Sequence, residues 1–136
     1  MRHHQRVALM ALCLGRAAGL GEEALSDLFR AAIVHDAGAV TYREKAALEK
    51  FDVDEPWEHC RRGHAFLADV RILGPVAEIV FSHHDHWAGG NPSGLRGDGI
   101  PLASRIIHLA DRVDVLIREG LHILDRRKEI VTRVRD

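Results

Sequence analysis

Two adjacent histidines, His83 and His84, end an apolar stretch and stand directly before a segment rich in glycine and proline. Neighbouring imidazoles followed by helix-breaking residues are poor material for a hydrophobic core, because each ring carries polar nitrogens that need a partner. They are good material for holding two metal ions side by side. Together with His35 and Asp36 upstream and Asp111 downstream, they predict a dinuclear metal site in a helical domain.

The apolar residues follow a helical period along nearly the whole chain, with little of the alternation that is typical of strands. We therefore expect an all-α fold with about six or seven helices, whose ends are marked mostly by glycine and proline. The expected helices cover residues 3–18, 22–34, 42–50, 54–73, 75–84, 100–117 and 121–133. Residues 85–99 hold five of the twelve glycines, and a loop of this length is usually functional or disordered.

The composition fits one globular domain, with 46% hydrophobic residues in a chain of 136. A formal net charge of −1 gives no reason to expect binding to DNA or to an anionic membrane. No apolar run approaches the roughly 20 residues that cross a bilayer. The two cysteines, Cys13 and Cys60, imply no disulfide framework and fit a reducing cytoplasm. Ten histidines are the compositional outlier, and they favour metal binding.

Seven candidate metal ligands are spread over five expected helices. They are His3, His35, Asp36, His59, His83, His84 and Asp111. Each has an ordinary alternative: a lone helix histidine is usually exposed or hydrogen-bonded, Asp36 could end a helix, and Asp111 could pair with Arg112 or Arg105. The joint occurrence of all seven argues against these alternatives. His4 is an alternative to His3, and the sequence leaves that choice open.

The donor types point to the metal and its chemistry. Imidazole nitrogen and carboxylate oxygen without thiolate favour iron or manganese, with zinc or nickel as alternatives. One carboxylate can bridge two cations about 3.5–4 Å apart, and Asp36, next to His35, is best placed to do so. Asp111 lies in a very apolar stretch, where a buried carboxylate needs a positive partner. We therefore expect two divalent metal ions and suspect hydrolysis of a phosphate ester.

The ordered set of these residues resembles the HD-GYP subgroup of the HD-domain metal-dependent phosphohydrolases. It reads His3-x-x-Arg6-Val7, His35-Asp36-Ala37-Gly38, His59-x-x-x-Gly63, His83-His84-Asp85, Gly90-Asn91-Pro92 and Ala110-Asp111. Each motif is short, but the order is specific and covers nearly the whole chain. The resemblance implies a compact all-α bundle with a central metal site. It makes residues 1–136 a single domain of this type, truncated at both ends.

The resemblance also implies a role for each ligand. One metal ion would be held by His3, His35, Asp36 and Asp111, and the second by His59, His83 and His84. Asp36 would be the catalytic carboxylate that bridges the two metals, and a hydroxide between them would be the nucleophile. The implied substrate is a cyclic dinucleotide of the cyclic di-GMP type, bound in part by Gly90, Asn91 and Pro92.

Three positions depart from the family's pattern. Ala39 stands where the family has a lysine, and Asn91 replaces the tyrosine of the Gly-Tyr-Pro motif. A basic clamp that follows the last metal aspartate in the family is missing, and Arg118 is the candidate to replace it. The expected metal ligands are untouched, which indicates a retained metal site with altered substrate binding.

Three functions are therefore open. The first is a metal-dependent phosphodiesterase that hydrolyses a cyclic dinucleotide. The second is an HD phosphohydrolase that acts on another nucleotide or an alarmone. The third is a catalytically weak or inactive metal-containing module that serves signalling or interaction. A sensor domain, a receiver domain or a second copy of the chain is the protein partner to expect.

Overall fold

The structure, a computed structural model, describes residues 2–48, 50, 56–118, 127–128 and 130–132. Six α-helices occupy most of these residues, and no strand is found among them. The helices are α1 (His3–Ala17), α2 (Glu22–Val34), α3 (Tyr42–Leu48), α4 (Trp57–Ala68), α5 (Gly74–Phe81) and α6 (Leu102–Arg118). Two short 3-10 helices are η1 (Arg71–Leu73) and η2 (Gly97–Gly99). The all-α fold expected from the sequence is confirmed.

The expected helix at 54–73 is wrong after Ala68. Helix α4 ends at Ala68, because Val70 takes an extended conformation with φ −100° and ψ 102°. The chain then turns through η1 into α5, which begins at Gly74. The expected capping residue Asp54 lies outside the described residues, as does most of the expected helix at 121–133.

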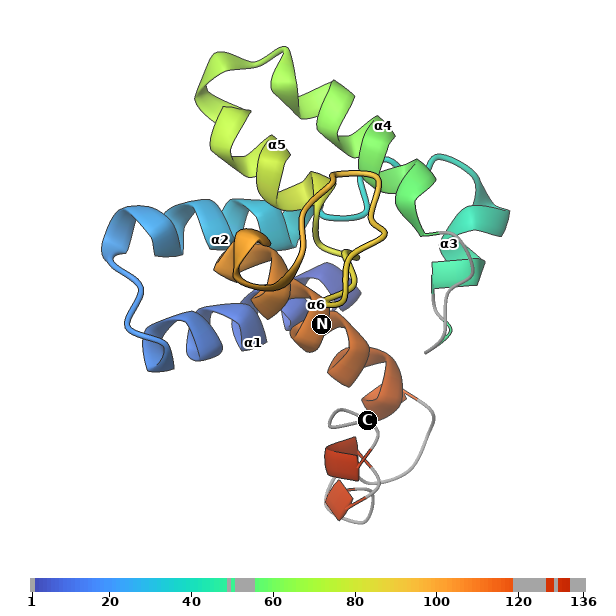
Figure 1. The fold of residues 1–136 in the computed structure, drawn as a ribbon. Coiled ribbons are helices and arrows are strands. Elements are labelled where there is room, and N and C mark those ends of the chain that lie inside the picture. Colours follow the sequence, from blue (N-terminus) through green and yellow to red (C-terminus); the bar gives the residue numbers. More distant parts are fainter. Residues whose placement is uncertain (1, 49, 51–55, 119–126, 129, 133–136) are drawn as a thin grey trace.

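Two helical hairpins and a crossing helix build the domain (Figure 1). Helix α1 packs against α2, α4 packs against α5, and α6 packs against α1. Helix α2 also contacts α5, which joins the two hairpins. Six of the fifteen residues of the buried apolar core are alanines, and such small side chains let helix axes approach closely. The core therefore brings several helix ends together at one place.

The sharpest contact in the fold joins the segment after α2 to the middle of α4. A Cβ added to Gly38 would lie 1.9 Å from the backbone oxygen of His59 and 2.6 Å from the backbone nitrogen of Gly63. Only a residue without a side chain fits there, since both neighbours are backbone atoms. This approach of two backbones sets Asp36, two residues before Gly38, against His59.

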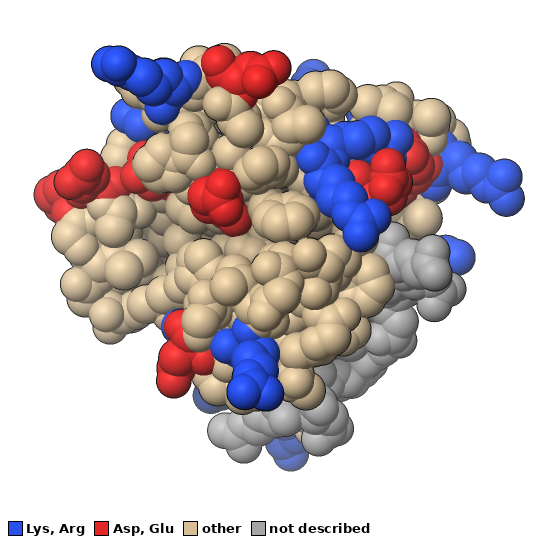
Figure 2. Space-filling view, turned by 45° about the horizontal axis from the view of Figure 1, so that its top comes forward, with Lys and Arg blue, Asp and Glu red and all other residues tan. Residues whose placement is uncertain are grey.

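The surface shows no strong separation of charge on the face drawn in Figure 2. Among the described residues of that face, acidic and basic side chains lie in small separate groups around an uncharged centre. None of the described helices combines the length and the apolar character that a membrane span requires.

Replacing Gly38 by Ala should destabilise the domain by about 3 kcal/mol, since the added methyl group meets two backbone atoms that cannot rotate away. Urea unfolding followed by circular dichroism measures this loss. Gly74→Ala is the matched control, because nothing lies within 4 Å of a Cβ added there, and it should change the stability by less than about 1 kcal/mol. Equal stability of the two variants would contradict the proposed backbone contact.

Candidate metal centre

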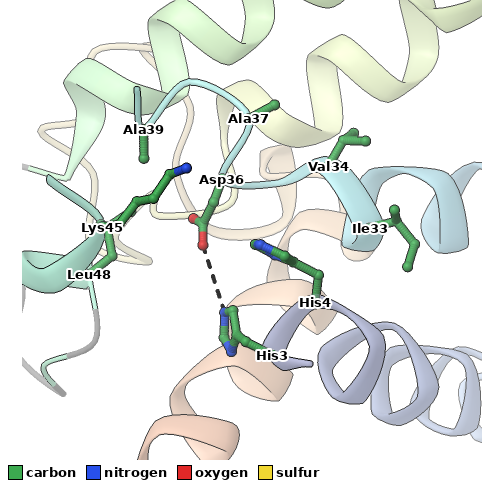
Figure 3. Close-up of a pocket in the computed structure, with 9 residues that line it drawn as sticks. All are labelled: His3, His4, Ile33, Val34, Asp36, Ala37, Ala39, Lys45 and Leu48. Atoms are coloured by element: carbon green, nitrogen blue, oxygen red, sulfur yellow. Dashed lines mark ion pairs between the residues drawn. The ribbon is translucent and has the colours of Figure 1, made fainter. Parts of the chain in front are cut away.

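All seven predicted ligands lie in one cluster, although they come from five parts of the chain. His3 opens α1, His35 and Asp36 follow α2, His59 belongs to α4, His83 and His84 follow α5, and Asp111 belongs to α6. Their nitrogen and oxygen atoms form two neighbouring groups. His4 joins the first group beside His3, so the structure keeps both of these residues as candidates. Figure 3 shows this side of the cluster.

The first group surrounds one oxygen of Asp36. In His3, His4, His35 and Asp36, one ligand atom of each residue lies within 4.8 Å of the others. Oδ2 of Asp36 is 3.3 Å from Nε2 of His35 and 3.7 Å from Nε2 of His3. Asp111 closes this group, because its Oδ1 lies 3.3 Å from Nε2 of His3.

The second group consists of His59, His83 and His84, all of which are buried. The Nε2 atoms of His59 and His83 are 3.4 Å apart, so the two rings face the same point. The other oxygen of Asp36, Oδ1, lies 3.6 Å from Nε2 of His59. Asp36 therefore turns one carboxylate oxygen toward each group.

Hydrogen bonds to backbone carbonyls fix two of the rings in the tautomer that a metal needs. Nδ1 of His35 donates to the carbonyl of Ala32 at 2.9 Å, and Nδ1 of His83 donates to that of Val80 at 2.7 Å. With its proton on Nδ1, a neutral ring has its lone pair on Nε2, the atom that faces the cluster. Nε2 of His35 is buried and has no hydrogen-bond partner among the described residues. Such an orphaned nitrogen fits a metal ligand.

The carboxylates attract positive charge to the first group. Burial alone would lower the pKa of His3, but hydrogen bonds with Asp111, Asp114 and Asp36 outweigh it and raise that pKa to about 11. Burial also opposes ionisation of Asp36, yet the neighbouring His35 and His3 hold its pKa well below the usual value. In a protein without metal, protons on imidazoles therefore balance the acids. A bound cation can take over that role.

The second group is held neutral. Burial, reinforced by His35 and His59, lowers the pKa of His83 to about 3. Burial, reinforced by His83, lowers the pKa of His84 well below the usual value. Neutral imidazoles keep their lone pairs, so these residues are ready to bind a metal without losing a proton.

One supporting residue, Asp114, was missed in the sequence. Asp114, one turn after Asp111, accepts the Nδ1 proton of His3 at 2.7 Å and is itself held by Arg6, whose Nε donates at 2.6 Å. Arg112 donates to Oδ2 of Asp111 from Nη2 at 2.6 Å and from Nε at 3.2 Å. The ordinary ion pair considered for Asp111 thus exists beside its contact with His3. A spacing of three between two acids on a helix could have pointed to Asp114.

The loop after His84 is held by its own side chains. Asn91 is buried, and its Oδ1 accepts from the backbone nitrogen of His86, while its Nδ2 donates to the carbonyls of His86 and Leu95. Asp85 is bonded to Ser93. The amide of Asn91 therefore organises the loop, and Gly90 and Pro92 flank it on the exposed side. The side chain of Arg118 lies outside the described part of the chain.

Two further residues near the second group have a supporting role. Nδ1 of His108 donates to the carbonyl of His83 at 3.0 Å. Cys60 is buried, with its Sγ 3.7 Å from Nε2 of His59 and from Nδ1 of His83. Burial raises the pKa of this thiol, so it stays protonated, and the donor set is one of nitrogen and oxygen.

Comparison with known proteins agrees with this geometry. A family model described as HD domain matches residues 1–127. The chain is 31% identical over 117 residues to 3'3'-cGAMP-specific phosphodiesterase 1 of Vibrio cholerae serotype O1, a match that covers 85% of this chain and 27% of the relative. It is 34% identical over 123 residues to 3'3'-cGAMP-specific phosphodiesterase 2 of the same organism, covering 84% of this chain and 23% of the relative.

A third relative comes from another organism. The chain is 29% identical over 126 residues to the cyclic di-GMP phosphodiesterase of Thermotoga maritima, covering 85% of this chain and 34% of the relative. The chain thus spans between about a quarter and a third of the length of these curated relatives.

We expect manganese to raise the midpoint of thermal unfolding, because an ion that binds only the folded state stabilises it, by about 2.7 kcal/mol at one hundred times its dissociation constant. His84→Gln removes a buried donor and should reduce this stabilisation. His64→Gln is the matched control, since His64 faces Glu78 at the surface, and it should keep the full shift. Differential scanning calorimetry with and without manganese measures both. Identical shifts in the two variants would exclude His84 as a ligand.

Asp114→Asn should weaken metal binding by roughly 10–100-fold, the usual effect of removing an outer partner of a ligating histidine. The amide keeps the shape but loses the charge that orients His3. Asp27→Asn, which changes a partly exposed acid of α2 paired with Arg30, is the control. Competition with a metal-chelating dye gives the affinities, and an unchanged value for Asp114→Asn would show that His3 needs no such support.

Proposed function

Because the chain belongs to the HD domain family, we propose that it hydrolyses a phosphodiester bond of a cyclic dinucleotide with two divalent metal ions. In this proposal the first ion is held by His3, His35, Asp36 and Asp111, and the second by His59, His83 and His84. The observation that carries the proposal is the placement of Asp36, whose two oxygens face the two groups of donors at 3.3 Å and 3.6 Å. A carboxylate in that position can bridge two metal ions.

The donor set favours iron or manganese, with zinc or nickel as alternatives, since it combines imidazoles and carboxylates without thiolate. Two such ions supply a hydroxide nucleophile at neutral pH and neutralise the phosphoryl oxygens. The protein itself fixes the ligands: Asp114 orients His3, Arg112 orients Asp111, and the carbonyls of α2 and α5 orient His35 and His83.

The substrate class is supported by the relatives, whose names specify 3'3'-cGAMP or cyclic di-GMP. These two molecules share a ring of two nucleotides joined by phosphodiester bonds, which is the chemistry that the two-metal arrangement suits. A pocket of about 340 Å³ opens beside Asp36 and is lined by His3 and His4 among others (Figure 3). It lies in the size range of small-molecule sites. The loop at Gly90, Asn91 and Pro92, and Arg118, remain our candidates for further substrate contacts.

The test is metal analysis and turnover with protein prepared under anaerobic conditions. We expect two ions of iron or manganese per chain. We also expect conversion of cyclic di-GMP or 3'3'-cGAMP to a linear dinucleotide, which liquid chromatography measures. Asp36→Asn should lose metal and lower kcat by more than about 100-fold, beyond the effect typical of outer partners. Asp27→Asn on the preceding helix α2 is the control and should keep both.

Other outcomes would contradict the proposal in distinct ways. Hydrolysis of a mononucleotide or an alarmone alone would move the chain to a different substrate class. Full metal content without turnover of any of these compounds would favour a signalling module. Full activity in Asp36→Asn would refute the bridging carboxylate.

A further inference from the structure

Helix α3 is held over the metal pocket by polar contacts and not by the core. None of its residues is buried. It begins with a capping box, in which Glu44 accepts from the backbone nitrogen of Thr41 at 3.0 Å while Thr41 Oγ1 accepts from the backbone nitrogen of Glu44 at 3.2 Å. The other oxygen of Glu44 accepts from Arg62 of α4. The start of α3 is therefore tied to the helix that carries His59.

The end of α3 is tied to the metal cluster itself. Arg112 donates from Nη1 to the carbonyl of Lys50 at 2.7 Å and from Nη2 to that of Leu48 at 3.4 Å. The same guanidinium holds Oδ2 of Asp111. One buried side chain thus sets both a proposed ligand and the last turn of α3. The end of this short helix is therefore linked to a proposed metal ligand.

Between these two ties, Lys45 faces the pocket. It lines the same space as His3, His4 and Asp36, and Figure 3 shows its amino group pointing toward the Asp36 side of that space. It is the one lysine or arginine among the nine residues described as lining the pocket. No ion pair within 4 Å involves Lys45 in the described part of the chain, so its charge is available to a ligand.

Apart from the two histidines, the rest of the pocket offers no side-chain donor for an anion. Its other walls are Ile33, Val34, Ala37, Ala39 and Leu48, whose side chains carry no polar atom. His3 is a metal ligand in our proposal, His4 is its alternative beside it, and Asp36 repels anions. An ammonium group is a compact point charge that suits phosphate oxygens.

We propose that Lys45, reaching from α3 toward the proposed metal ligands, binds a phosphate oxygen of the substrate in this pocket. The inference rests on the proposed function for the identity of the substrate, but it predicts binding of any small phosphate ligand. Lys45 then acts in substrate binding, and the metal ligands are independent of it.

The experiment measures inorganic phosphate binding to manganese-loaded protein by isothermal titration calorimetry, together with KM and kcat for cyclic di-GMP and 3'3'-cGAMP. Lys45→Met should raise the dissociation constant for phosphate, and KM, by about tenfold, with kcat changed much less. Lys45→Arg keeps the charge and should stay within about threefold of the wild type. Arg43→Met removes the same charge from an exposed residue of α3 that does not line the pocket, and should leave phosphate binding unchanged. Metal content should be equal in all four proteins.

Several outcomes would overturn the inference. These are unchanged phosphate affinity in Lys45→Met, an equal loss in Arg43→Met, or no phosphate binding by the manganese-loaded wild type. A wild type that binds phosphate through Lys45 but hydrolyses no cyclic dinucleotide would refute the proposed function and leave the inference intact.

Discussion

The structure depends on the need to compensate two buried carboxylates. Asp36 and Asp111 lie among imidazoles with little access to water, and a buried charge is costly unless it is paired. Without metal, positive charge on His3 and His35 supplies the pairing, as the raised pKa values of both rings indicate. On the other side His83 and His84 are neutral. Their group meets the carboxylate of Asp36 at His59, whose Nε2 lies 3.6 Å from Oδ1. Cations at both places would satisfy all of these groups together.

The backbone contributes directly to this arrangement. Helix ends leave carbonyl groups without partners, and α2 and α5 end just before their histidines. In each case the ring three residues later donates from Nδ1 to such a carbonyl, His35 to that of Ala32 and His83 to that of Val80. The hydrogen bond satisfies a carbonyl of the helix end and fixes the tautomer of the ring. The backbone at a helix end thereby orients the ring of a nearby histidine without a bond to another side chain.

The sequence sufficed to predict the helical class and the convergence of the proposed ligands, because His35-Asp36 and His83-His84 stand at helix ends where core residues are unexpected. It did not suffice for the supporting contacts. Asp114 and Arg6 are 108 positions apart in the chain, so no local pattern relates them. The end of α4 was misplaced because the extended conformation of Val70 has no glycine or proline to signal it. The internal bonding of Asn91 likewise depends on how the loop closes, and composition alone does not determine this.

The proposed metal ligands and the proposed substrate contact stand on helices that are held in different ways. The ligands stand on elements that pack into the core, and Gly38 permits their closest approach. None of the residues of α3 is buried, and its two ends are held by Arg62 and Arg112. In our proposal the positive charge of the pocket comes from Lys45 on α3, while Ala39 on another wall carries no polar side-chain atom. Arg112 links α3 to the cluster, because it holds Asp111 and the end of α3 with the same guanidinium.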